Sequence, residues 1–205
     1  INVIAERASH HSIELNPLKE LSSVNKLDEI PVRQPYYCAG CPHNSSTKAS
    51  DGEIVGMGIG CHSISGFINP DTITNFTQMG GEGAFWIGRA PFSERSHSFQ
   101  NMGDGTYAHS GYLGVRAAVA AGVNITFKML VNDAVAMTGG QSAQGGSSPF
   151  SMAQQLLAEG VKKVVIVSDQ PDQIRKSARW PATVDFFHRD KTLKVQDELS
   201  QIKGV

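Results

Sequence analysis

The sequence predicts an α/β domain in which a parallel sheet carries helices on both faces. Short apolar runs that read as strands end in glycine clusters, and alanine-rich or proline-free segments between them favour helices. The apolar runs are nearly continuous rather than alternating, which is typical of parallel strands covered on both sides. Ligands of such sheets bind at the carboxyl ends of the strands, so the glycine-rich ends are the first places to look for a site.

Six strands and two helices are expected along the chain. The strands are predicted at 53–59, 72–77, 98–102, 125–131, 163–168 and 184–187, and the helices at 107–121 and 151–159. Residues 1–35 are poor in apolar side chains and contain Pro17, Pro31 and Pro35, which interrupt regular elements. We therefore expect 1–35 to be a linker or an extension from a preceding domain, and 36–205 to be the domain itself. The first residue is not Met, which favours a piece of a longer chain.

Composition excludes several classes of partner. The net charge is -1 and lysines and arginines form no long runs, so neither nucleic acid nor a membrane surface is an expected partner. No apolar stretch approaches the roughly 20 residues of a bilayer helix, and no signal peptide opens the chain, so a cytoplasmic location is expected. The three cysteines are an odd number, which favours a metal or redox role over a disulfide framework.

The most informative pattern is Gly103-Asp104-Gly105, followed after 26 residues by Asn132. A strand that ends in a glycine turn and feeds a helix presents backbone N–H groups to an anion. An aspartate there would repel a diphosphate unless a cation such as Mg²⁺ lay between them. The gap equals one helix and the next strand, so Asn132 returns to the same sheet edge. Taken alone, Gly-Asp-Gly is more simply an ordinary turn, with Asn132 capping a loop.

This spacing resembles the signature of thiamine-diphosphate enzymes. The stretch 132–141, Asn-Asp-Ala-Val-Ala-Met-Thr-Gly-Gly-Gln, is similar to the matching segment of 2-oxoacid:ferredoxin oxidoreductases. The resemblance implies a thiamine-diphosphate-binding domain with Mg²⁺ held by the Asp104 carboxylate, the Asn132 side chain and the backbone carbonyl of Ala134. It also implies that Thr138 and Gly139 form a turn over the diphosphate, and it leaves Asp133 without a role.

The cysteines form Cys38-x-x-Cys41, with Cys61 following after 19 residues. From the residues alone, Cys61 could be a structural thiol, the pair a thioredoxin-like redox site, or all three a zinc site completed by His43 or His62. The order resembles that of the ferredoxin oxidoreductases, and Tyr36 to Asn44 looks like the segment of the large indolepyruvate enzymes. That implies a [4Fe–4S] cluster on Cys38, Cys41 and Cys61, whose fourth cysteine, further toward the C-terminus in the family, is missing here.

Two further loops are candidates for contact with the cofactor. Gly60, Cys61 and His62 follow the first strand, and Gly80 lies in 78–83, which resembles another cofactor-facing loop of the family. For 78–83 the alternative is a glycine turn with a solvated Glu82. The stretch 36–50 has little apolar content, so without a cluster we expect no core to order it.

The ordered set of motifs over about 33–190 implies oxidative decarboxylation of a 2-oxoacid, such as the aryl pyruvate indolepyruvate, with coenzyme A and ferredoxin. The implied partners are the pyrimidine-binding domain of the same enzyme and a second copy of the full enzyme in a homodimer. The glutamate that activates the cofactor is expected in that other domain, so no catalytic residue is assigned here and the chain alone should be inactive. The alternatives are a non-oxidative thiamine-dependent decarboxylase domain and a non-catalytic zinc-binding α/β domain.

Overall fold

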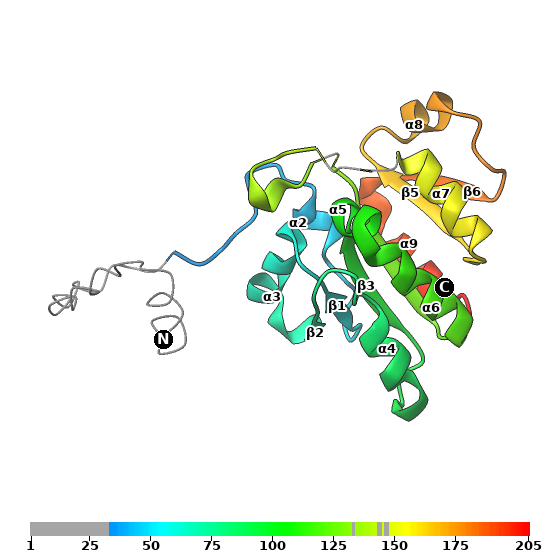
Figure 1. The fold of residues 1–205 in the computed structure, drawn as a ribbon. Coiled ribbons are helices and arrows are strands. Elements are labelled where there is room, and N and C mark those ends of the chain that lie inside the picture. The colour runs from blue at the N-terminus through cyan, green and yellow to red at the C-terminus, as the bar shows by residue number, and fades with distance from the viewer. Residues whose placement is uncertain (1–32, 133, 143–144, 146–147) are drawn as a thin grey trace, which may run out of the picture. The chain divides into compact units, whose positions relative to one another are not determined.

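The computed structural model describes residues 33–132, 134–142, 145 and 148–205, and the account below concerns the unit Pro35–Val205 (Figure 1). All six expected strands are present, although the first is shorter than expected. They are β1 (Val55–Met57), β2 (Ile73–Phe76), β3 (Ser98–Gly103), β4 (Ile125–Leu130), β5 (Val164–Ser168) and β6 (Val184–His188).

The strands form two parallel sheets. The larger has the order β2-β1-β3-β4, and the smaller pairs β5 with β6. The α/β class with a parallel sheet is therefore confirmed. The expected single sheet is divided, because β4 and β5 do not pair with each other within the described residues.

Helices connect the strands and include several that the sequence did not predict. They are α2 (His43–Ser46), α3 (Ser65–Ile68), α4 (Ala84–Arg89), α5 (Asp104–Thr106), α6 (Tyr112–Ala121), α7 (Pro149–Ala158), α8 (Pro171–Ser177) and α9 (Thr192–Ser200). A π-helical turn, Tyr107–Gly111, joins α5 to α6, so the predicted helix 107–121 begins three residues earlier, at Asp104. The predicted helix 151–159 is α7, whose first turn is capped by the Ser148 hydroxyl. None of the described helices is long and apolar enough to cross a bilayer.

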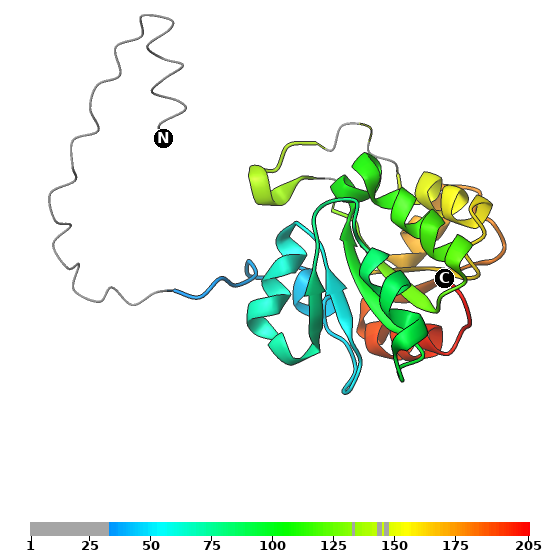
Figure 2. The same ribbon diagram turned by 60° about the horizontal axis from the view of Figure 1, so that its bottom comes forward.

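Side chains of β4 show that both faces of the larger sheet are covered. Ile125 packs in a core cluster with Trp86 of α4 and Ala118 of α6. The Lys128 ammonium instead donates to the Lys48 carbonyl at 2.9 Å and to the Gln196 side chain of α9 at 3.4 Å. Alternate residues of a strand point to opposite faces, so α4 and α6 lie on one side of β4 and α9 lies on the other, as Figures 1 and 2 show.

The segment 36–50 has a small core of its own, contrary to the expectation from its composition. Tyr37, His43 and Thr47 are buried. The Tyr37 hydroxyl donates to Thr47 Oγ1 at 3.1 Å, and its ring meets the His43 ring edge-to-face at 5.7 Å. One aromatic and one histidine ring replace the aliphatic side chains that the segment lacks, so the expectation that it has no core was wrong.

Gly114 provides a test of how closely α6 approaches the loop after β2. A Cβ atom at Gly114 would lie 2.4 Å from the Glu82 carbonyl oxygen, a backbone atom that cannot rotate away. We expect Gly114→Ala to lower the free energy of unfolding by about 1–3 kcal/mol in urea denaturation, because the helix must move. Gly88→Ala is the matched control: nothing lies within 4 Å of its Cβ, and it should be neutral or stabilising by up to about 1 kcal/mol. Equal effects of the two substitutions would contradict the close approach.

Candidate functional site

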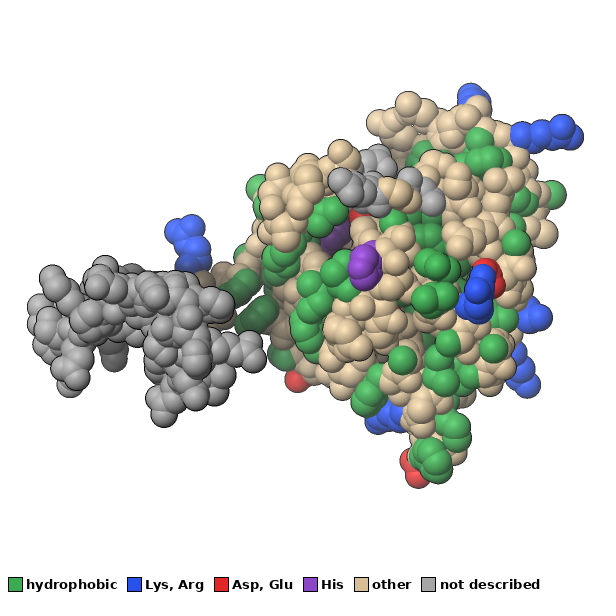
Figure 3. All heavy atoms as spheres, viewed as in Figure 1, with side chains coloured by type: hydrophobic (Ala, Val, Ile, Leu, Met, Phe, Trp, Pro, Cys, Tyr) green, Lys and Arg blue, Asp and Glu red, His purple; other side chains and the backbone are tan. Residues whose placement is uncertain are grey.

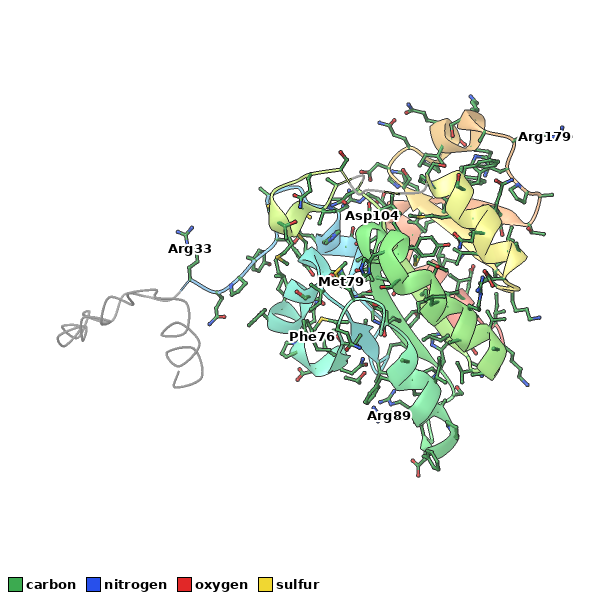
Figure 4. The ribbon with its side chains drawn as sticks, in the orientation of Figure 1. Arg33, Phe76, Met79, Arg89, Asp104 and Arg179 are labelled. Atoms are coloured by element: carbon green, nitrogen blue, oxygen red, sulfur yellow. The ribbon has the colours of Figure 1, made fainter. Side chains whose placement is uncertain are left out.

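The carboxyl ends of β1, β3 and β4 meet at a small pocket of about 60 Å³. These strands are neighbours in one parallel sheet, so the loops that follow them emerge at the same edge. Figure 4 shows Asp104 there, at the start of α5. Eight residues singled out from the sequence line this pocket: Gly60, Cys61, His62, Gly103, Asp104, Gly105, Asn132 and Ala134.

Asp104 connects two of the loops around the pocket. One oxygen of its carboxylate accepts the N–H of Gly105 at 2.8 Å, and the other accepts the N–H of Asn132 at 3.1 Å. Asp104 is also the first residue of the helical stretch, and its side chain is buried. A carboxylate at a helix N-terminus is stabilised by the helix dipole, and these hydrogen bonds fix its direction.

The oxygen atoms around Asp104 fit a hard divalent cation. The Asn132 side-chain oxygen accepts the N–H of Ala134 at 3.3 Å, so the loop after β4 turns back toward the pocket. A carboxylate, an amide oxygen and a backbone carbonyl are the ligand types that Mg²⁺ shares with phosphates. The N-terminus of the helix beginning at Asp104 favours an anion through its dipole, so the residues present suit a magnesium–diphosphate pair.

Two histidines flank the pocket, and both are buried. His62 is 1% exposed, and its Nε2 has no hydrogen-bond partner within the described part of the chain. Burial lowers the pKa of His62 to about 4, with a smaller contribution from the nearby His43. Burial also lowers the pKa of His43, although the Asp104 carboxylate opposes this. Both rings are therefore neutral at pH 7, and the Nε2 atom of His62 is a polar group that a bound molecule could satisfy. Figure 3 shows histidine and hydrophobic side chains side by side on this face.

The three cysteines are neighbours but do not form a ready-made ligand set. Burial raises the pKa of the Cys61 thiol, and the nearby Cys41 and Cys38 raise it further, so the loop after β1 and the 38–41 turn come together. Cys38 is exposed, and the other two are partly buried. Across the described ranges, no three His, Cys, Asp or Glu side chains are gathered closely enough to hold a metal ion. Neither an iron–sulfur nor a zinc site is therefore preformed in this part of the chain.

The loop 78–83 contributes to the pocket through a different residue than expected. Met79 lines the pocket, whereas Gly80 does not; Figure 4 labels Met79 in the loop that follows β2. The idea that Glu82 is solvated was wrong, because Glu82 is fully buried and its carboxylate accepts the Gly80 N–H at 2.7 Å. Burial raises the Glu82 pKa, which the two backbone N–H groups of Glu82 and Gly80 oppose.

Thr138 and Gly139 lie outside the pocket. They belong to a small loop closed by an antiparallel bridge between Val135 and Gln141, and Thr138 accepts a hydrogen bond from the Gln141 side chain at 2.6 Å. Both residues are exposed. Asp133 lies outside the described residues.

Sequence reasoning missed several residues of the pocket wall. They are Ile59, Met79, Thr106, Leu130, Val135, Ala136 and Met137. His43, which the sequence offered as an alternative zinc ligand, also lines the pocket. The apolar residues of the wall carried no sequence signal, because a hydrophobic residue in a glycine-rich loop gives the same pattern whether it lines a site or packs beneath it.

Comparison with known proteins gives matches at three levels. The family model described as thiamine pyrophosphate enzyme, C-terminal TPP binding domain, matches residues 58–180, more than half of the chain. Indolepyruvate oxidoreductase subunit IorA of Thermococcus kodakarensis is 25% identical over 195 residues, covering 86% of this chain and 28% of the relative. The subunit of the same name from Pyrococcus horikoshii is 23% identical with the same coverage.

A solved structure shares the fold. It is a 2-oxoglutarate:ferredoxin oxidoreductase from Magnetococcus marinus with 2-oxoglutarate, coenzyme A and succinyl-CoA bound. The TM-score is 0.51 at 20% identity, covering 77% of this chain and 65% of the other, so this likeness concerns the fold alone. The chain spans less than a third of the length of the curated relatives it matches.

Proposed function

Because the chain belongs to the family of C-terminal TPP binding domains of thiamine pyrophosphate enzymes, we propose that its pocket binds the diphosphate of thiamine diphosphate (thiamine pyrophosphate) together with Mg²⁺. One observation carries this proposal: the Asp104 carboxylate at a helix N-terminus is hydrogen-bonded to Asn132 across the pocket. The Mg²⁺ ligands would be Asp104, the Asn132 side chain and the Ala134 carbonyl.

Each part of the pocket has a defined task in this proposal. The start of the helical stretch binds the phosphates, while Gly103 and Gly105 leave space for them. Asp104 holds the cation, and its hydrogen bonds to two backbone N–H groups keep it oriented before the cation arrives. His62 offers its Nε2 atom as a hydrogen-bond partner to a bound group, and Thr138 and Gly139 close over the diphosphate when it is present. When bound, thiamine diphosphate supplies a nucleophilic carbon and an electron sink for decarboxylation.

The reaction we propose for the complete protein is oxidative decarboxylation of a 2-oxoacid, with coenzyme A as acyl acceptor and ferredoxin as electron acceptor. The names of the relatives and of the solved structure support this class, and those of the relatives favour indolepyruvate. The chain is a fraction of those relatives, so the pyrimidine-binding domain, its activating glutamate and the homodimer would lie outside these residues. The complete enzyme would be cytoplasmic.

Calorimetry on this chain tests the cofactor proposal directly. We expect thiamine diphosphate to bind in the presence of Mg²⁺ and not in EDTA, because the Asp104 carboxylate and the phosphates repel each other without a cation between them. Inorganic diphosphate should compete with thiamine diphosphate for the pocket. Binding that is unchanged by EDTA would contradict the assignment of the pocket.

Cys38, Cys41 and Cys61 would supply three ligands of a [4Fe–4S] cluster, with the fourth coming from outside this chain. After anaerobic reconstitution, this chain should contain labile iron in less than stoichiometric amount. A form extended to the next downstream cysteine should take up four irons together with sulfide. Equal and stable uptake by both forms would refute the argument for an external ligand. Zinc retained by both without iron would favour the zinc-binding domain. Magnesium-dependent cofactor binding without iron or zinc would favour the non-oxidative decarboxylase.

A further inference from the structure

The diphosphate pocket has two ends, which follow from the strand order β2-β1-β3-β4. Asp104 and Asn132 come after β3 and β4 and form the first end. Ile59 and Met79 come after β1 and β2 and line the second end. Neighbouring strands lie about 4.8 Å apart, so the two ends are separated by roughly 10 Å. Figure 4 labels one residue of each, Asp104 and Met79. A cofactor whose diphosphate lies beside Asp104 therefore has room for its remaining part at the second end.

A single buried carboxyl group joins the two loops of the second end. The Thr77 N–H donates to the Met57 carbonyl at 3.0 Å, and beyond this bond no backbone hydrogen bond connects the two loops in the described ranges. The Glu82 side chain makes the connection there. Its carboxylate accepts the Gly80 N–H, in the loop after β2, at 2.7 Å. It also lies against Gly58, directly after β1, where a Cβ atom would be 2.8 Å from the carboxyl carbon.

Gly80 is held from two sides, which leaves its loop little freedom. Its φ angle of 90° lies in the left-handed region, where a side chain would be strained. A Cβ atom there would also lie 2.5 Å from the hydroxyl oxygen of Ser110, in the π-helical turn that follows α5. Glu82 fixes the direction of the Gly80 N–H from the other side. The preceding residue, Met79, is thereby directed to the pocket wall.

A carboxyl group is a costly side chain for this position if it only fills space. Glu82 is 0% exposed, and its Oε1 atom has no hydrogen-bond partner within the described part of the chain. Burying an ionisable group in this way lowers stability, and burial raises the pKa of Glu82 for the same reason. A leucine would fill the space without that cost but could not accept the Gly80 N–H. The carboxyl group therefore indicates that this hydrogen bond has a task in the loop.

We propose that Glu82 is a positioning residue, which holds the loops after β1 and β2 in place for the part of the cofactor beyond its diphosphate. This inference rests on the proposed binding of thiamine diphosphate. Glu82 does not line the pocket and acts through Ile59 and Met79, whose partly exposed apolar side chains offer van der Waals contacts. The first end is fixed by the separate hydrogen bonds of Asp104. A change at Glu82 should therefore affect the two parts of the cofactor unequally.

Calorimetry with two ligands in Mg²⁺ tests this proposal. Glu82→Leu removes the acceptor of the Gly80 N–H, and Glu82→Gln keeps a neutral acceptor of similar shape. We expect Glu82→Leu to weaken thiamine diphosphate about tenfold, the size of one lost hydrogen bond, and inorganic diphosphate by less than about twofold. Glu82→Gln should restore most of the loss. The matched control is Glu94→Leu, which changes an exposed glutamate outside the pocket and should alter neither affinity.

Two further measurements examine the same contact without relying on that comparison. Gly58→Ala leaves Glu82 in place, but its Cβ would displace the carboxyl group, so it should reproduce the unequal loss. It also replaces Glu82→Leu in the comparison if that variant lacks a native circular dichroism spectrum. Amide exchange at Gly80 needs no ligand. We expect it to be about tenfold faster in Glu82→Leu and close to the original rate in Glu82→Gln.

Several results would overturn the inference. Equal weakening of both ligands, or no restoration by Glu82→Gln, would mean that Glu82 serves only the overall fold. Unchanged binding of thiamine diphosphate in Glu82→Leu would remove its role, and so would thiamine diphosphate that binds the original chain no more tightly than inorganic diphosphate. In these cases the diphosphate site itself still stands. Failure of inorganic diphosphate to bind the original chain would instead overturn the proposed function, and exchange at Gly80 would then decide whether Glu82 positions the loop.

Discussion

Replacing Asp104 with alanine should abolish the part of thiamine diphosphate binding that depends on Mg²⁺. The carboxylate is the only charged ligand in the proposed set, and a hydrogen bond or ligand contact to a charged group contributes about 1.5–3 kcal/mol. Each 1.4 kcal/mol changes affinity tenfold, so we expect a loss of roughly 10- to 100-fold in calorimetry with Mg²⁺. In EDTA the variant should bind no more weakly than the original chain, because the repulsive charge is gone.

Two further variants separate the charge of Asp104 from its shape. Asp104→Asn keeps the size but places an amide nitrogen where a carboxylate oxygen now accepts a backbone N–H, so it should lose Mg²⁺ dependence as well. Asp172→Ala is the matched control, since Asp172 is exposed on α8 and does not line the pocket. Full Mg²⁺-dependent binding by Asp104→Asn would show that the charge does not hold the cation.

The parts of the fold that were predicted correctly have strong local signals. Four of the six residues in the run 163–168 are β-branched, and the run contains β5. The alanine-rich stretch after Gly105 forms α6. The helix α4 was missed because it has six residues, including Gly88 and two aromatic side chains, and its formation depends on burial of Trp86. The division of the sheet was also missed, because local sequence does not record whether two strands separated by a loop and a helix pair with each other.

The residues of the candidate site also fall into those that the sequence could place and those that it could not. Residues that lie a short distance after a strand, such as Cys61, Asp104 and Asn132, meet at one pocket, because strand direction fixes where their backbones emerge. Thr138 and Gly139 lie six and seven residues after Asn132, in the loop that follows β4. The small bridge between Val135 and Gln141 directs them away from the pocket. Loop paths of this kind depend on tertiary contacts, and their role over the diphosphate stays a prediction.

The tryptophan of α4 should be among the most sensitive positions of the fold. Trp86 is 3% exposed and packs with Ile54, Ala118 and Ile125 between α4, α6 and the sheet. Its indole N–H also donates to the Asn124 carbonyl at 2.8 Å, which fixes the turn before β4. Large-to-small replacement of a buried aromatic residue costs about 3–5 kcal/mol, and a domain of this kind is stable by only about 5–15 kcal/mol. We therefore expect Trp86→Ala to remove a large share of the total stability.

Urea denaturation followed by circular dichroism measures this loss without depending on tryptophan fluorescence. Trp86→Phe keeps most of the buried ring but loses the hydrogen bond to Asn124, so it should cost about 1–1.5 kcal/mol and separate packing from hydrogen bonding. Phe92→Ala is the control for removing an aromatic side chain from the same region, because Phe92 is 90% exposed and its loss should change stability by less than about 0.5 kcal/mol. If Trp86→Ala costs no more than Phe92→Ala, then α4 does not pack on the sheet as described, and the approach of Gly114 to the loop before α4 must be reconsidered with it.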